Sequence, residues 1–151
     1  MKNLQKTDKT YWMERAFEAS DRSLCMRGES RMGAVAVKNG KLLAFGFNGV
    51  VGKIQHCGDR GFCIRKKLNV PSGSQREIAF CICAEQRMIC NAARKGVSLC
   101  GADVYITHYP CAYCVRLMIE SGIARVYYSQ DYCQQFTKTV CEESGFELVK
   151  F

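Results

Sequence analysis

Three cysteines in the second half of the chain have the residue type and spacing of a metal site. Cys111 and Cys114 form a C-x-x-C pair in "PCAYC", and Cys83 stands before Ala-Glu in "FCICAEQRMI". We expect Cys83 and the pair to begin two helices, where unpaired backbone amides and the helix dipole stabilise the thiolates that bind zinc. Two sulfurs from one helical turn reach the same tetrahedral ion, and a third ligand comes from elsewhere. The pattern predicts Cys83, Cys111 and Cys114 as zinc ligands.

Glu85 gives this site the means to do proton chemistry. It lies two residues after Cys83, so we expect its carboxylate to lean over the metal without binding it. Three protein ligands leave a fourth position open, which distinguishes catalytic zinc from structural zinc. Pro110 fixes the loop that presents Cys111. The alternative is a closed four-cysteine site that adds Cys81 and does no chemistry, but it leaves Glu85 and Pro110 unexplained.

Alternating helices and strands must position these residues. "MGAVAVKNGKLLAFGFNG" indicates two strands around Asn39-Gly40, a dipeptide that favours a tight hairpin. Residues 50–80 lack periodicity, and so long a loop in one domain is either functional or held by a ligand. The alternation in the second half implies parallel crossovers in an α/β/α sandwich. We predict helices over 10–25 with Thr10 as the cap, 84–95 and 112–121, strands over 102–107 and 124–129, and a short helix and final strand after Tyr132.

Length and composition favour one globular domain. The chain has 151 residues without a linker, so we expect a single domain over residues 1–151. Apolar residues make up 48% of the chain, which is too many for a disordered protein. "MKNLQKTDKT" lacks the apolar stretch of a secretion signal, and no run of about eighteen apolar residues occurs, so we expect a cytoplasmic protein away from membranes. Thiols stay reduced there, so some of the eleven cysteines should bind metal.

The net charge of +8 favours a partner that carries phosphate, either a nucleic acid or a small nucleotide. The positive residues are spread along the chain, with one group at Arg65-Lys66-Lys67, so charge alone does not separate these partners from an ordinary basic surface. A zinc-stabilised nucleic-acid-binding module is therefore one alternative. It is less favoured because no clear stripe of aromatic and basic residues for single strands appears.

Taken together, the motifs resemble the zinc-dependent cytidine and deoxycytidylate deaminase superfamily, most closely its deoxycytidylate (dCMP) branch. The resemblance implies a five-stranded mixed sheet flanked by helices, homo-oligomers, and a hydrolase that converts dCMP to dUMP. A zinc-activated water would attack the cytosine ring, with Glu85 as the proton shuttle. Deamination of a free cytidine, deoxycytidine or modified nucleoside is the nearest rival. The resemblance runs from about Tyr11 to Tyr132 and rests on "CAE", "PCAYC", "RSLCMR", "GAVAVKNGKLLAFGFNG", "HCGDRGFC", "VPSGSQRE" and "SGIARVYY".

The resemblance also implies substrate contacts, each of which has a structural alternative. Asn48 with Gly49 would also serve as turn residues, and Arg27 as a surface arginine at a helix end. The tyrosines would also serve as packing aromatics, and His108 is expected to be a neighbour of the site rather than a ligand. The implied contacts are Ala84 and Tyr109 at the base, Asn48 at the sugar hydroxyl, and Arg27, with Ser23 and Tyr132, at the 5′-phosphate.

The chain departs from the branch at the metal site. Cys83 stands where a histidine is usual, and three thiolates on zinc leave a net negative charge that a nearby cation would balance. We expect Arg87, four residues beyond Cys83, or Arg76 to hydrogen-bond a ligand sulfur. Some relatives hold a second, structural zinc between the first helix and the long loop. Its candidate ligands here are Cys25, His56, Cys57, Cys63 and Cys81.

Overall fold

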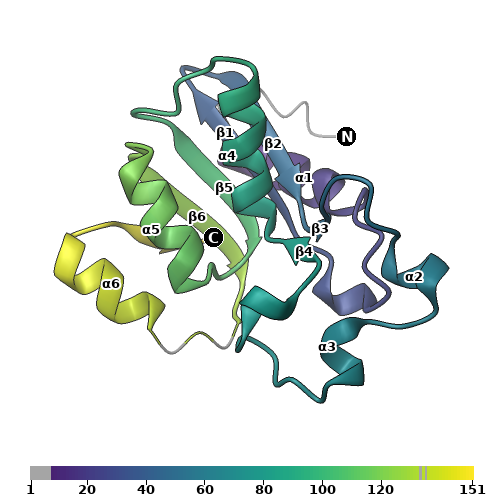
Figure 1. Cartoon of the computed structure of the whole chain (residues 1–151). Helices are drawn as coiled ribbons and strands as arrows, with labels where there is room; N and C mark the ends of the chain where they lie inside the picture. The colour runs from purple at the N-terminus through teal and green to yellow at the C-terminus, as the bar shows by residue number, and fades with distance from the viewer. Residues whose placement is uncertain (1–7, 133, 135) are drawn as a thin grey trace.

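A mixed five-stranded sheet forms the centre of the computed structural model, which describes residues 8–132, 134 and 136–151 (Figure 1). Its strands are β1 (Gly33–Lys38), β2 (Lys41–Phe47), β5 (Asp103–His108), β6 (Arg125–Gln130) and β7 (Leu148–Lys150). They lie in the order β2-β1-β5-β6-β7. β1 is antiparallel to β2 and β5, whereas β5, β6 and β7 run parallel. The mixed five-stranded sheet that the sequence predicts is confirmed.

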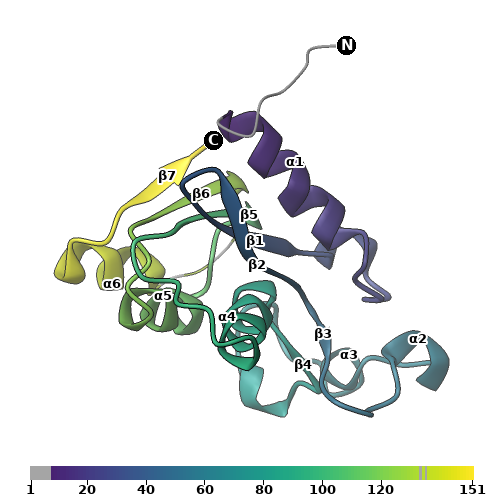
Figure 2. The same cartoon turned by 90° about the horizontal axis from the view of Figure 1, so that it is seen from above.

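Helices cover both faces of this sheet. α1 (Lys9–Ser20) packs against β1 and β5 on one face, and α4 (Ala84–Arg94), α5 (Ala112–Glu120) and α6 (Thr137–Ser144) lie on the other (Figure 2). α5 and α6 are the crossovers that make the last three strands parallel. The α/β/α sandwich is therefore confirmed. Within the described residues, no helix is both long and apolar enough to span a membrane.

The core consists of two clusters, one on each face of the sheet. Along β5, Val104 and Ile106 enter the larger cluster, which α4 and α5 cover, and Tyr105 enters the smaller cluster under α1. This alternation is that of a strand buried on both faces. Met88 of α4 and Met118 of α5 are fully buried beside it. The helices that begin with the predicted metal ligands are thus anchored in the larger cluster.

Local signals determine several element ends. The predicted hairpin is confirmed, with positive φ at Asn39 (51°) and Gly40 (68°) between β1 and β2. The predicted cap of the first helix is wrong: the Asp8 side chain accepts the backbone N–H of Thr10 at 2.9 Å, so Asp8 is the cap. That helix also ends at Ser20, before the predicted Cys25.

β2 and α4 approach each other closely at Gly46. A Cβ atom on Gly46 would stand 2.2 Å from the carbonyl oxygen of Ala84 and 2.4 Å from the backbone nitrogen of Met88. Only a residue without a side chain allows the strand to lie so near the helix backbone. Gly46 therefore sets the position of the first turn of α4.

The segment between β2 and α4 is more structured than the loop that the sequence predicts. β3 (Gly49–Val50) pairs antiparallel with β4 (Cys81–Ile82) and closes its base. The buried side chain of Arg65 donates to the carbonyls of Pro71 and Ser74, both at 2.7 Å. Elements this short carry no readable hydrophobic period, which is why the sequence indicates only a loop. The segment also contains α2 (Cys57–Arg60), α3 (Ile64–Lys67) and the 3-10 helix η2 (Arg76–Ile78).

Candidate active site

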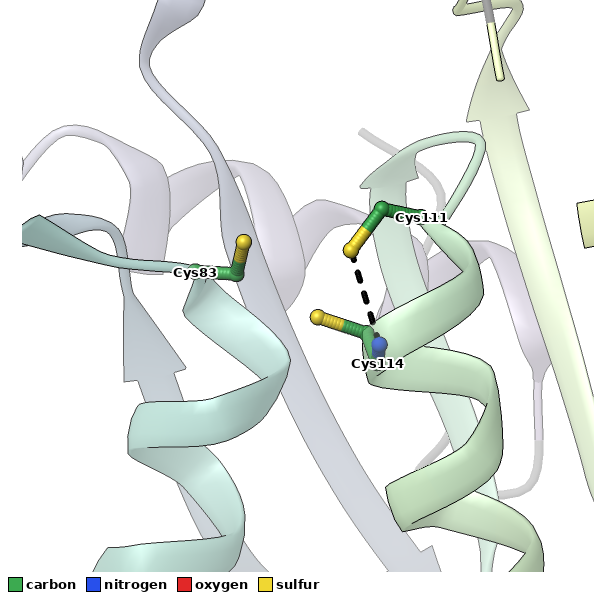
Figure 3. Close-up of side chains that lie close together, drawn as sticks. All are labelled: Cys83, Cys111 and Cys114. Atoms are coloured by element: carbon green, nitrogen blue, oxygen red, sulfur yellow. Dashed lines mark hydrogen bonds between the residues drawn. The ribbon is translucent and has the colours of Figure 1, made fainter. Parts of the chain in front are cut away.

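Two neighbouring helices of the same layer begin with a cysteine. Cys83 is the N-cap of α4, where its backbone N–H donates to the side-chain oxygen of Gln86 at 2.9 Å. Cys111 is the N-cap of α5, where its sulfur accepts the backbone N–H of Cys114 at 3.5 Å (Figure 3). N-cap side chains receive the unpaired amides of the first helical turn, and those amides favour a thiolate. Both predicted helix starts are confirmed.

The side chains of Cys83, Cys111 and Cys114 point toward one another (Figure 3), and their sulfur atoms all lie within 4.8 Å of each other. Zinc–sulfur bonds of 2.3 Å at tetrahedral angles require sulfurs roughly 3.8 Å apart, so a small contraction suffices. Cys111 and Cys114 are buried, and Cys83 is half-buried. Three convergent, largely buried sulfurs fit a zinc ion with one open position.

The three thiols hydrogen-bond one another and shift one another's pKa values. Hydrogen bonds from Cys114 and Cys83 hold the pKa of Cys111 far below its ordinary value. The same contacts with Cys111 raise the pKa values of Cys83 and Cys114. Three thiols that lie this close together can share one divalent cation, which binds them in their deprotonated form.

Glu85 lies in the first turn of α4 beside these sulfurs. Its side chain is buried, and burial, assisted by the negative charge of Cys111, raises the pKa of its carboxyl group to about 7. A carboxyl group that titrates near neutral pH both accepts and donates protons readily. The arrangement therefore places an acid–base group next to the three convergent sulfurs.

One of the two candidate arginines contacts a sulfur. Arg76 Nη1 donates to Cys83 Sγ at 2.9 Å, which confirms the prediction for this residue. Arg87 instead donates to the backbone carbonyls of Phe47, Gly49 and Val50, at 2.8, 2.9 and 2.9 Å. The prediction is wrong for Arg87 because the chain that leaves β2 passes beside α4 and presents these carbonyls to it. Arg87 thus ties β2 and β3 to the helix.

A cavity of about 350 Å³ opens beside Cys83. Three of the predicted substrate contacts, Arg27, Asn48 and Tyr132, line it, together with Arg76. Within the described part of the chain, the Nε atoms of both arginines are buried without a hydrogen-bond partner. The cavity thus offers cationic donors next to the metal ligands. Its lining is Arg27, Ser30, Met32, Asn48, Arg76, Glu77, Ala79, Cys81, Ile82, Cys83, Gln86, Tyr113 and Tyr132.

Asn48 braces one wall of this cavity. Its Oδ1 accepts the backbone N–H of Met32 at 2.8 Å, and its Nδ2 donates to the carbonyl of Ser30 at 2.7 Å. An amide oxygen has two acceptor positions and an amide nitrogen two hydrogens, so each end keeps one for another partner. Asn48 is therefore more than a turn residue.

Tyr109 does not line the cavity. Its backbone N–H donates to the carbonyl of Gln130 at 2.7 Å, and its ring packs edge-to-face on Tyr128, with 5.0 Å between the ring centres. It lines a separate hollow over α6 and β7. The aromatic rings at the cavity are Tyr132 and Tyr113, and the sequence interpretation missed Tyr113. Its signal was its place inside "PCAYC", in the first turn of α5.

Other predicted residues lie near the site without lining it. Ser23 is fully buried, and its hydroxyl accepts the backbone N–H of Cys25 at 3.3 Å. Ala84 is buried at the start of α4. His108 ends β5, where its Nδ1 shares a hydrogen bond of 2.8 Å with the Thr107 hydroxyl. That contact agrees with a neighbouring rather than a ligating role.

The candidate ligands of a second zinc come partly together. The Cys57 and Cys63 thiols hydrogen-bond, and burial, followed by the charges of Cys63, Cys81 and Cys25, raises the pKa of Cys57. His56 is the N-cap of α2. Among the residues that the structure places, only Cys83, Cys111 and Cys114 bring three donor atoms within 4.8 Å of one another. The second zinc therefore stays a prediction.

Both the sequence and the structure of this chain are similar to those of known deaminases. Residues 6–130 match the sequence profile of the cytidine and deoxycytidylate deaminase zinc-binding region. The chain is 33% identical over 136 residues to the ComE operon protein 2 of Bacillus subtilis, and 33% identical over 143 residues to a deoxycytidylate deaminase of Saccharomyces cerevisiae. It is also similar to the crystal structure of the dCMP deaminase from cyanophage S-TIM5 in complex with dCMP and dUMP. The TM-score is 0.79 at 27% identity.

These matches differ in how much of each protein they cover. The alignments include 89% of this chain and 66% of the Bacillus protein, and 93% of this chain and 41% of the yeast enzyme. The chain thus spans less than two thirds of the length of these two relatives. The cyanophage structure, in contrast, is covered completely, together with 99% of this chain.

Proposed function

The chain belongs to the cytidine and deoxycytidylate deaminase family, and from this membership we propose that it is a zinc-dependent hydrolase that deaminates dCMP to dUMP. The observation that carries the proposal is the convergence of three cysteine sulfurs beside buried Glu85, at a cavity that holds Arg27. The similarity to a dCMP deaminase over nearly the whole chain supports the nucleotide as substrate.

We propose that Cys83, Cys111 and Cys114 hold the zinc ion. Three thiolates leave one coordination position open, as in catalytic zinc sites. A zinc ion held there would act as a Lewis acid that activates water for attack on C4 of the cytosine ring.

The ten cysteines that the structure describes are all free thiols, which supports placing the protein in the reducing cytoplasm.

In this proposal Glu85 moves the protons. It accepts a proton from water, donates it to N3 of the ring, and later passes a proton to the departing ammonia. Water adds to the ring and ammonia leaves, so dCMP and water become dUMP and ammonia. The burial of Glu85 and its pKa of about 7 support this role, because a group that gives and takes protons works best when its pKa is near the ambient pH.

We expect two residues of the cavity lining and one backbone amide beside it to bind the substrate. Arg27 would hold the 5′-phosphate, and its place in the cavity lining supports this role. Asn48 would use its remaining amide hydrogen or lone pair for the sugar hydroxyl. Ala84, as the first residue of α4, has a backbone N–H with no partner inside its helix, which supports its contact with the base.

We also propose that the protein forms homo-oligomers. Large apolar side chains are exposed along α5 and directly before α6, two helices that pack against each other, namely Tyr113, Leu117 and Phe136. Exposed apolar groups that lie together often mark a protein–protein interface. A nucleic acid remains the less favoured partner.

Ammonia release from dCMP, deoxycytidine, CMP and cytidine tests the function. Loss of a charge-assisted hydrogen bond of about 1.5–3 kcal/mol should make deoxycytidine roughly 10- to 100-fold slower than dCMP. Glu85→Gln should reduce turnover about 10²- to 10⁴-fold while zinc content is retained. Equal rates with and without the phosphate would refute the nucleotide assignment. Absence of activity on all four substrates would favour the nucleic-acid-binding module.

A further inference from the structure

Gln86 of α4 has one polar group that the fold does not use. Its Oε1 accepts the backbone N–H of Cys83 at 2.9 Å, across the first turn of the helix. An amide nitrogen carries two hydrogens, and within the described part of the chain no residue accepts a hydrogen bond from Nε2 of Gln86. Gln86 is half-buried and lines the cavity beside Cys83. Two donor hydrogens are thus available to a ligand in this cavity.

The hydrogen bond to Cys83 determines which end of the amide is free. The oxygen and nitrogen of a glutamine side chain are told apart by their partners, and a backbone N–H can bond only the oxygen. Nε2 therefore cannot take the place of Oε1 without breaking the contact with Cys83. A ligand that meets this side chain in the cavity meets a donor, so the ligand group that binds there is an acceptor.

The helix cap alone does not require a glutamine. In a capping box the third helical residue is Glu or Gln, and either side chain accepts the N–H of the N-cap residue. The first turn of a helix favours the negative charge of a carboxylate, so Glu would serve this cap at least as well. Gln86 differs from a glutamate in two ways: it donates through Nε2, and it adds no negative charge beside the three convergent sulfurs.

We infer that Gln86 is a substrate-binding residue, whose Nε2 donates a hydrogen bond to an oxygen of the nucleoside part of the substrate while its Oε1 caps α4. The inference rests on the proposed function, which supplies the substrate. Gln86 follows Glu85 and is bonded to Cys83, so the part of the nucleotide beside it is the part near the reacting carbon. The phosphate is expected at Arg27 instead. The cytosine carbonyl and the sugar both present oxygens that accept such a bond.

Two variants separate the donor from the cap. Gln86→Glu keeps an oxygen for the N–H of Cys83 but loses both donor hydrogens, whereas Gln86→Met loses donor and cap together and adds no charge. Both should lower kcat/KM about 2- to 10-fold, the usual effect of one neutral hydrogen bond, and by the same factor for dCMP and deoxycytidine. Only Gln86→Met should lower the denaturant midpoint of the zinc-loaded protein. Gln55→Met is the control and should change neither quantity, because Gln55 is exposed and lies outside the cavity lining.

Elemental analysis of each variant shows that the rates compare zinc-loaded enzymes. A loss of kcat/KM in neither variant, or in Gln86→Met alone, would overturn the inference, because Gln86 would then be only a helix cap. A loss in Gln86→Glu alone would overturn it as well, since the added charge would be the cause. A loss confined to dCMP would place the acceptor on the phosphate and contradict the assignment to the nucleoside. A wild-type protein that deaminates neither substrate would instead refute the proposed function.

Discussion

The backbones of Gly46 and Ala84 are in direct contact: a Cβ atom on Gly46 would stand 2.2 Å from the carbonyl oxygen of Ala84. Gly46→Ala should therefore destabilise the protein by about 3 kcal/mol, the upper end for overpacking, because both atoms that the new methyl group meets belong to backbone. Denaturant unfolding measures this. Gly58→Ala is the matched control, since nothing lies within 4 Å of its Cβ position inside α2, and it should be neutral or slightly stabilising. Equal stability of the two variants would contradict the close contact.

Glu85 should make the stability of the metal-free protein depend on pH. Folding raises the pKa of its carboxyl group from 4.5 to about 7, so the folded state binds the proton more tightly than the unfolded state. The stabilisation by the bound proton is complete below pH 4.5 and is lost as the pH rises through 7. At pH 8 the buried charge costs about 3 kcal/mol, from 1.36 kcal/mol per pKa unit.

Glu85→Gln removes this dependence. The free energy of unfolding of Glu85→Gln, relative to that of the wild type, should therefore rise by about 3 kcal/mol between pH 4.5 and pH 8. Chelator-treated proteins, unfolded in denaturant at both pH values, provide the measurement. A difference between variant and wild type that stays constant across this range would show that folding does not perturb the carboxyl group.

Arg27 should determine the preference for a phosphate. Arg27→Gln is expected to raise the KM for dCMP about 10- to 100-fold, from the loss of a charge-assisted bond. It should change kcat/KM for deoxycytidine little. Arg31→Gln is the nearby control, because Arg31 is exposed and lies outside the cavity lining. If Arg27→Gln reduced both substrates equally, Arg27 would be a structural residue of the cavity wall.

The cysteines outside the active site determine whether we expect one or two zinc ions per chain. If Cys57 and Cys63 hold a second zinc with Cys25 and Cys81, the purified protein contains two zinc ions per chain. Cys57→Ser should then retain one zinc and lose stability, whereas Cys111→Ser should lose the other zinc together with activity. Elemental analysis on purified protein distinguishes these cases, and a wild-type value near one per chain would exclude the second site.

Local chemistry in the sequence was enough to predict that three cysteine sulfurs come together. Cys83, Cys111 and Cys114 stand at helix N-termini, and both the helix starts and the spacing of the pair are properties of short segments. The hairpin at Asn39-Gly40 was predictable for the same reason. The family resemblance was needed to predict five strands in a mixed sheet, and their order was not predicted, because nothing in a short segment specifies which distant strand it will join.

Residues whose roles depend on distant segments were harder to predict. Arg87 lies on the expected face of its helix, but the carbonyls after β2 are nearer partners than the sulfur. Tyr109 was expected at the base, yet the parallel pairing of β5 with β6 turns its ring onto Tyr128. Tyr113, which directly precedes Cys114 in the C-x-x-C pair, lines the cavity instead. Helical spacing relates residues within a single helix, whereas the contacts of Arg87, Tyr109 and Tyr113 depend on how two elements pack together.

The pairing of β3 with β4 makes the segment between β2 and α4 a closed loop, because its two ends meet at the same place on the sandwich. Lengthening such a loop changes the free energy of closing it little, by about 0.6 kcal/mol for each doubling in length. Insertions and deletions there leave the registers of the sheet and the helix starts undisturbed. Changes in length should therefore be tolerated best away from the turn that Arg65 holds at Pro71 and Ser74, because that turn leads directly to Arg76 in the cavity lining.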